Sequence, residues 1–147
     1  MTTITTTDPA SAASEPMALD LGDVQARTLD EAVLTVSHPQ TGAATAMRIT
    51  LSSPDSAAFR QKMNRMQDNA MREAVRRPKG RLMTAEEQQS LSIKSLVAAT
   101  LGWEGVRMGG EALPCTAENA HMVYDAYPWL REQVAAFQGD RQNFFGE

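Results

Sequence analysis

The sequence has few of the residues from which catalytic and metal sites are usually built. Among its 147 residues are one cysteine, Cys115, and two histidines, His38 and His121. One cysteine cannot form an internal disulfide, and these three side chains do not make up a zinc site. No glycine-rich loop precedes a Gly-Lys-Ser or Gly-Lys-Thr sequence, which excludes a phosphate-binding loop. We therefore expect a protein that is not an enzyme and that needs neither metal nor cofactor.

A cysteine nucleophile is the one enzymatic alternative. Cys115 and His121 lie six residues apart across an expected helix start, where the helix dipole lowers the pKa of a thiol. Proximity in sequence says little about geometry, and a free cysteine is more often a small buried apolar residue. The adjacent pair Glu86 and Glu87 is explained by helix capping rather than by catalysis.

Long apolar segments are also missing. No stretch approaches the roughly 20 apolar residues that a membrane helix needs, and the first 16 residues lack the basic and apolar regions of a secretory signal. Residues 1–16 carry one large apolar side chain, Ile4, and predict a mobile N-terminal arm. We expect residues 17–139 to form a single domain, residues 140–147 to form an aromatic C-terminal tail, and the protein not to contact membranes.

The charges are segregated along the chain, although the net charge is only −4. Residues 60–82 carry a local charge of +6, and the segments on either side carry −5 each. Arg72, Arg76 and Arg77 are the candidate contact residues of this basic segment. It contains no aromatic side chain on which single-stranded bases could stack. We therefore favour a solvated helix face or an acidic protein partner over nucleic acid, and a nucleic-acid-binding regulator is the less favoured alternative.

A β-hairpin is predicted near the N-terminus. The segments 32–38 and 44–51 are rich in β-branched residues, and the second alternates apolar and polar side chains. The four residues 39–42, Pro-Gln-Thr-Gly, form a turn sequence between them. Leu19 and Leu21 are candidates for a short third strand. A hairpin alone is marginal in water, so it must pack on helices or pair with something else.

Four helices are predicted after the hairpin. Ser53 and Pro54 start the first helix, which should run to Arg77, and the capping box at Thr84 starts a second that ends at Gly102. Val106 to Leu113 reads as a small hairpin or a loop. Thr116 caps the third helix, and Pro128 opens the last, which Gly139 stops. The predicted fold is α+β and predominantly helical, with a small N-terminal β-hairpin followed by about four helices.

Exposed apolar residues are the remaining candidates for partner binding. Phe144 and Phe145 lie in a polar tail, and either fold back onto the core, which is the commoner outcome, or serve as a docking element. Trp129 is a contact residue if it is exposed and a core residue if its removal destabilises the domain. Nine methionines add a weak indication of an adaptable surface. We expect truncation after Gly139 to leave the domain folded and to weaken partner binding.

Short patterns strung in a fixed order over residues 30–145 resemble the tail assembly chaperones of long-tailed, siphovirus-like bacteriophages. They include Gly102-Trp103-Glu104-Gly105, the segment 113–120 (Leu-Pro-Cys-Thr-Ala-Glu-Asn-Ala), the segment 127–134 beginning Tyr-Pro-Trp-Leu, and the segment 140–145 ending in Asn-Phe-Phe. The hairpin at 38–42, the segment 51–56 and the basic helix that follows have the same layout. Each pattern alone is weak, and Cys115 stands where the family would have a less distinctive residue.

The resemblance implies a non-enzymatic role during virion assembly. Such chaperones bind the tape measure protein and keep it soluble until tail tube subunits replace them. The implied partners are therefore the tape measure protein and tail tube subunits. Whether the basic helix meets the client, a tube subunit or another copy of this protein is left open by the sequence. The implied location is the host cytoplasm during assembly, with the protein absent from the mature virion. The alternative is a minor structural tail protein that is retained in the virion.

Overall fold

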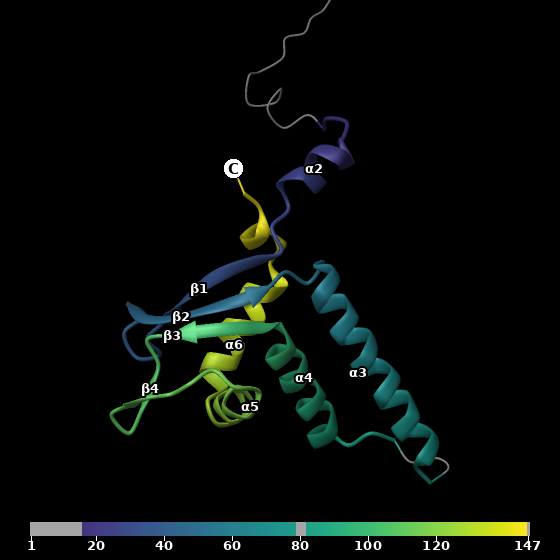
Figure 1. Cartoon of the computed structure of the whole chain (residues 1–147), viewed down its shortest axis with the longest axis vertical. Helices are drawn as coiled ribbons and strands as arrows, with labels where there is room; N and C mark the ends of the chain where they lie inside the picture. The colour runs from purple at the N-terminus through teal and green to yellow at the C-terminus, as the bar shows by residue number, and fades with distance from the viewer. Residues whose placement is uncertain (1–15, 79–81, 147) are drawn as a thin grey trace, which may run out of the picture.

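The structure, a computed structural model, describes residues 16–78 and 82–146 (Figure 1). The predicted mobile arm falls outside these residues except for Pro16. The fold is α+β, as predicted, and the described residues form four α-helices after the hairpin and one short helix before it. The elements in chain order are α2 (Leu21–Arg27), β1 (Glu31–Ser37), β2 (Ala44–Ser52), α3 (Ala57–Arg76), α4 (Ala85–Ala99), β3 (Thr100–Glu104), β4 (Arg107–Met108), β5 (Glu111–Ala112), α5 (Ala117–Ala126), α6 (Pro128–Gly139) and the 3-10 helix η1 (Arg141–Phe144).

The predicted hairpin is confirmed as strands β1 and β2, which pair antiparallel with Leu34 opposite Ile49. Gly42 takes a φ of +74° in the turn between them, a conformation that glycine adopts without steric cost. The alternation of β2 places Ile49 and Leu51 in the core, where both are fully buried. The hairpin is therefore half of a two-layer arrangement, with helices covering one face of the sheet (Figure 1).

The third strand was predicted in the wrong place. It is β3, which pairs antiparallel with β2 and sets Trp103 opposite Ile49. Asp20 caps α2 instead, because its carboxylate accepts hydrogen bonds from the backbone N–H groups of residues 22 and 23. The predicted helix 84–102 correspondingly ends at Ala99, and Gly102 lies in β3 rather than in a left-handed helix cap. For residues 100–104, pairing with the open edge of β2 is more favourable than forming another helical turn, because β preference depends on tertiary context.

The helix starts follow the predicted capping rules, with one shift. Ser56, not Ser53, caps α3, and its Oγ accepts a hydrogen bond from the Phe59 N–H at 3.2 Å. Thr84 and Thr116 cap α4 and α5 as expected, and Pro128 is the first residue of α6. Residues 106–113 form the small hairpin β4–β5, the first of the two predicted alternatives.

The core lies between the sheet and the helices α4, α5 and α6. Its fully buried side chains include Val36, Ile93, Tyr124 and Val134, drawn from each of these layers. α3 packs along α4 and extends away from the sheet (Figure 1). The predicted apolar face of α3 is buried at Phe59 but becomes exposed by Ala74. Among the described residues, no helix combines the length and the hydropathy needed to cross a membrane.

Candidate functional site

An apolar cleft of about 460 Å³ opens at one end of the sheet, a size typical of small binding pockets. Three parts of the chain line it: the turn end of β1 and β2, the β4–β5 hairpin, and the junction between α5 and α6. The side chains that give it apolar character are those of Val36, Pro39, Met47, Val106, Met108, Leu113, Val123, Tyr127, Trp129 and Leu130. The cleft therefore combines aromatic and methionine side chains, which suit contacts with apolar partners.

Gly105 allows the β4–β5 hairpin to form one wall of the cleft. Its φ is +71°, and a Cβ at this position would lie 2.1 Å from the carbonyl oxygen of Ala46 in β2. No larger residue can bring the chain this close to β2 without displacing it. The Trp103 indole then holds the far end of the hairpin, since its Nε1–H donates to the Leu113 carbonyl at 2.8 Å.

Trp129 and Tyr127 form the opposite wall, at the start of α6. Their ring centroids lie 6.4 Å apart in an edge-on arrangement, the geometry that aromatic pairs prefer. Trp129 is half-buried and Tyr127 is exposed. Trp129 thus packs against the core and also lines the cleft, so it combines the two roles that the sequence left open.

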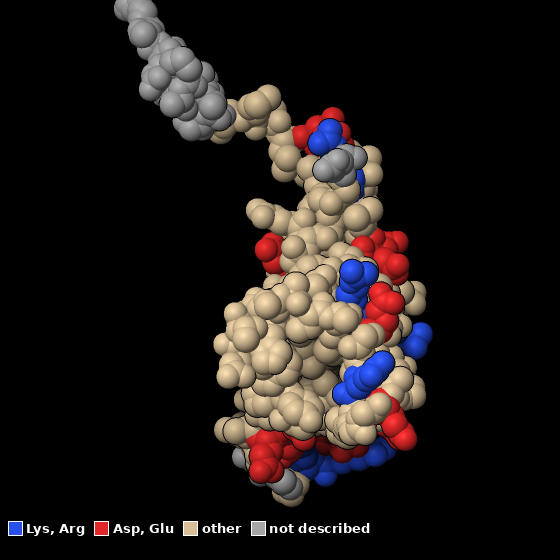
Figure 2. Space-filling view, turned by 90° about the vertical axis from the view of Figure 1, so that its left-hand side faces the viewer, with Lys and Arg blue, Asp and Glu red and all other residues tan. Residues whose placement is uncertain are grey.

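None of the described residues that line the cleft is acidic, and His38 and Arg107 are the basic side chains among them. Figure 2 shows the side of the molecule that carries the β1–β2 turn and the β4–β5 hairpin. Most of this face is free of charged side chains, which gather along one edge and at the lower end. The cleft is accordingly suited to an apolar segment that carries an acidic residue beside it.

The basic helix divides into exposed and paired residues. Arg72 and Arg76 are exposed on α3, and Arg76 makes a loose contact with Glu73, 3.7 Å away. Arg77 is different, because it is half-buried and its guanidinium donates to the carboxylate of Glu87 at the start of α4. This pair lowers the pKa of Glu87 and raises that of Arg77. Arg77 therefore joins α3 to α4 and is not the free contact residue that we expected.

The predicted C-terminal tail is part of the domain. Phe144 is 1% exposed and meets Phe137 edge-on, with ring centroids 5.8 Å apart. This burial contradicts its expected role as a docking residue and shows that it folds back. Phe145 is 41% exposed and still available to a partner.

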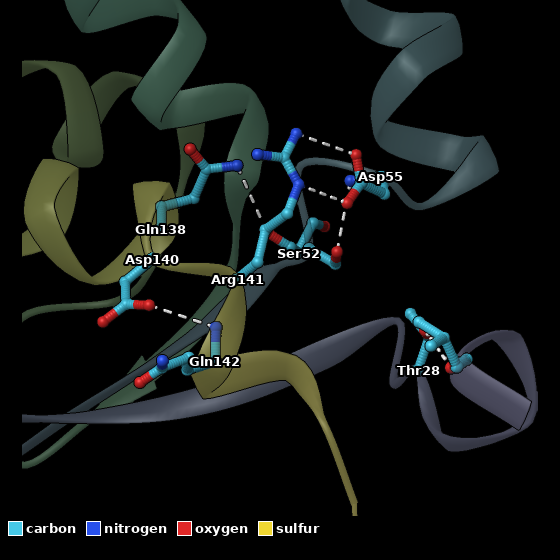
Figure 3. Close-up of polar contacts among 9 residues, drawn as sticks. Thr28, Ser52, Asp55, Gln138, Asp140, Arg141 and Gln142 are labelled. Carbon is cyan, nitrogen blue, oxygen red and sulfur yellow. Dashed lines mark hydrogen bonds and ion pairs between the residues drawn. The ribbon is translucent and has the colours of Figure 1, made fainter. Parts of the chain in front are cut away.

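Polar contacts also hold residues 140–146 against the domain (Figure 3). Arg141 makes two hydrogen bonds to Asp55, 2.7 Å from Nε to Oδ2 and 3.1 Å from Nη2 to Oδ1. The hydrogen bonds from Arg141 hold the pKa of Asp55 below its usual range. The backbone N–H of Leu29 also donates to the Phe144 carbonyl at 2.7 Å. Residues 140–146 thus close one end of the core. A chain truncated after Gly139 should therefore be less stable, contrary to the expectation from the sequence.

Cys115 is half-buried just before α5, and burial raises the pKa of its thiol. A raised pKa keeps the thiol protonated at neutral pH, the opposite of what an activated nucleophile needs. Among the described residues, no three Cys, His, Asp or Glu side chains come together as a metal site.

No protein-family model, curated protein or solved structure matches this chain.

The cleft was not predicted from the sequence, although one of its residues was. Trp129 was a candidate, whereas Met47 was assigned to a strand, Met108 to a small hairpin or loop, and Tyr127 to a helix, with no shared role. The sequence offers one local indication of the cleft, the glycine at position 105 between β3 and the β4–β5 hairpin. A glycine there does not reveal which segments it brings together.

Proposed function

We propose that this protein is a bacteriophage tail assembly chaperone that binds the tape measure protein and keeps it soluble while the tail tube assembles. The resemblance of the ordered sequence patterns supplies the identity of the client. The observation that carries the proposal is the apolar cleft lined by Trp129, Tyr127 and Met108. A chaperone of this kind needs an accessible apolar surface that tolerates variation in its client.

The cleft would bind one short stretch of client at a time. Its volume accommodates a few apolar side chains, and Arg107 and His38 would attract acidic residues that flank them. Many copies bound along one long client would cover its apolar stripe, each at modest affinity. Release by tube subunits then requires only local competition at each site.

Co-expression with the tape measure protein of the same genome tests the proposal. We expect the client to move from the insoluble to the soluble fraction and to co-purify with this protein. A client that stays insoluble and does not co-purify would contradict the chaperone role. In purified virions, the chaperone should be absent, whereas a minor structural tail protein would be present.

A further inference from the structure

We infer that the β4–β5 hairpin is a lid, which pivots on its base and closes over the cleft when an apolar segment binds there. The inference rests on the proposed function for the identity of that segment, which is the client. The motion of the hairpin is a property of this chain alone, so it can be measured without the client.

The base of the hairpin is fixed to the domain on both sides. Gly105 leads into it, packed against the carbonyl oxygen of Ala46, and the Trp103 indole holds Leu113 where the chain leaves. The Leu113 N–H also donates to the Val106 carbonyl at 3.0 Å and closes the base. Any movement of the hairpin must therefore take place beyond these residues.

The rest of the hairpin stands free of the domain. Residues 107–112 are all exposed, and they share no hydrogen bond or ion pair with any other described part of the chain. Gly109 and Gly110 form the tip, and a Cβ at either position would meet nothing within 4 Å. Figure 1 shows the hairpin as a narrow loop that projects from the domain.

A hairpin of this size is easily displaced. Each strand has two residues, with Arg107 opposite Ala112 and Met108 opposite Glu111. A two-stranded hairpin alone is marginal in water. Segments with few buried contacts open at a low cost in free energy, and the lids of binding sites are drawn from such segments. Beyond its fixed base, the hairpin therefore has the properties of a lid.

An apolar segment in the cleft would favour the closed position. Met108 on the hairpin and Tyr127 on the opposite wall both line the cleft, and each is 39% exposed. A client side chain between them would remove both from water once the hairpin closes on it. The client would thus bind the closed position better than the open one, which is the condition for a ligand to shift such an equilibrium. Closure would also slow the release of the bound segment.

Distances between paired spin labels test the motion, after Cys115→Ser removes the native thiol. Gln40→Cys with Glu111→Cys is the lid pair, because it joins the β1–β2 turn to the hairpin. Gln40→Cys with Glu118→Cys is the control pair, because it joins the same turn to α5. All three labelled positions are exposed. In the free protein, we expect a broader distance distribution for the lid pair than for the control pair. With client bound, the lid pair should narrow and shorten by several ångströms, and the control pair should stay unchanged.

A second variant loosens the base of the hairpin. Trp103→Phe keeps an aromatic ring against the core but removes the indole N–H that donates to Leu113. We expect a broader distribution for the lid pair, an unchanged one for the control pair and severalfold faster release of the client. Circular dichroism checks that the variant is folded.

The lid is overturned if the lid pair in the free protein is as narrow as the control pair, or if bound client leaves the lid pair unchanged. In either case a client that still co-purifies leaves the proposed chaperone role intact, with the hairpin as a rigid wall of the cleft. A client that does not bind contradicts the chaperone role instead, and the distribution in the free protein then decides the motion of the hairpin by itself.

Discussion

Replacing Gly105 with alanine is expected to damage the wall of the cleft. The new methyl group would lie 2.1 Å from the carbonyl oxygen and 2.6 Å from the carbonyl carbon of Ala46. Both are backbone atoms of β2, so no side-chain rotation relieves the clash. Gly109 provides the matched control, since its φ is +63° and a Cβ there meets nothing within 4 Å.

Both substitutions should lower the free energy of unfolding, and Gly105→Ala has one additional cause. Both force alanine into the left-handed region, which costs about 1–2 kcal/mol. Only Gly105→Ala also has to displace packed backbone, for which overpacking costs of about 1–3 kcal/mol are a guide. We therefore expect Gly105→Ala to lower the free energy of unfolding by about 2–5 kcal/mol and Gly109→Ala by about 1–2 kcal/mol.

Urea denaturation followed by circular dichroism measures this difference. The midpoints should fall in the order wild type, Gly109→Ala, Gly105→Ala, with equal slopes if all three unfold in two states. Equal midpoints for the two variants would refute the close approach of Gly105 to β2, and with it the position of the cleft wall.

Three other predictions concern the C-terminal segment. Phe144→Ala should reduce the free energy of unfolding by about 3–5 kcal/mol. Phe145→Ala should change it by less than about 1 kcal/mol, because Phe145 is partly exposed. Equal losses of stability in thermal melts would contradict the burial of Phe144. Truncation after Gly139 should destabilise at least as much as Phe144→Ala, and an unchanged melting temperature would show that the segment is dispensable. Arg141 lowers the pKa of Asp55 in the folded state. The stability contributed by this ion pair should therefore be present above the unfolded pKa of about 3.9 and be lost as the pH falls through the lower folded value. The difference in urea midpoint between wild type and Asp55→Asn should shrink from pH 6 to about pH 3, and a difference that stays constant would disprove the contribution of the pair.

Local sequence rules predicted the elements whose cause is local. The caps Thr84 and Thr116 and the opening Pro128 were identified because each satisfies or avoids a backbone N–H within its own helical turn. The hairpin β1–β2 was predicted because its alternation and turn residues are contiguous. These features need no knowledge of distant segments.

The errors involve partners that lie in a different element of the fold. Thr100 to Glu104 continue an apolar helical pattern, and only the free edge of β2, some fifty residues earlier, makes them a strand. Phe144 looked like a docking residue because its neighbours are polar, and its partner Phe137 lies on the far side of a glycine. Arg77 looked free because Glu87, to which it is paired, stands at the start of the next helix.

The cleft itself is a long-range property. It exists because Gly105 brings one hairpin against β2 and because the α5–α6 junction turns Tyr127 and Trp129 toward the same opening. Arg72 and Arg76 are exposed on α3, and Arg76 makes one loose contact, with Glu73 of the same helix. Their role as contact residues stays a prediction.

Two methionines provide the most direct test of the proposal that the cleft binds the client. Met108 lines the cleft and Met122 does not, yet both are 39% exposed. Substitution by glutamine keeps the shape of the side chain and removes its apolar character. The client can bury at most the 39% of the Met108 side chain that is exposed. Since burying a whole methionine is worth about 1.5–3 kcal/mol, losing this share should weaken client binding about three- to sevenfold.

The measurement is the fraction of tape measure protein that stays soluble on co-expression with wild type, Met108→Gln or Met122→Gln at equal levels of folded chaperone. We expect Met108→Gln to lower the soluble fraction severalfold and Met122→Gln to leave it at the wild-type value. Equal soluble fractions for the two variants would contradict client binding in the cleft.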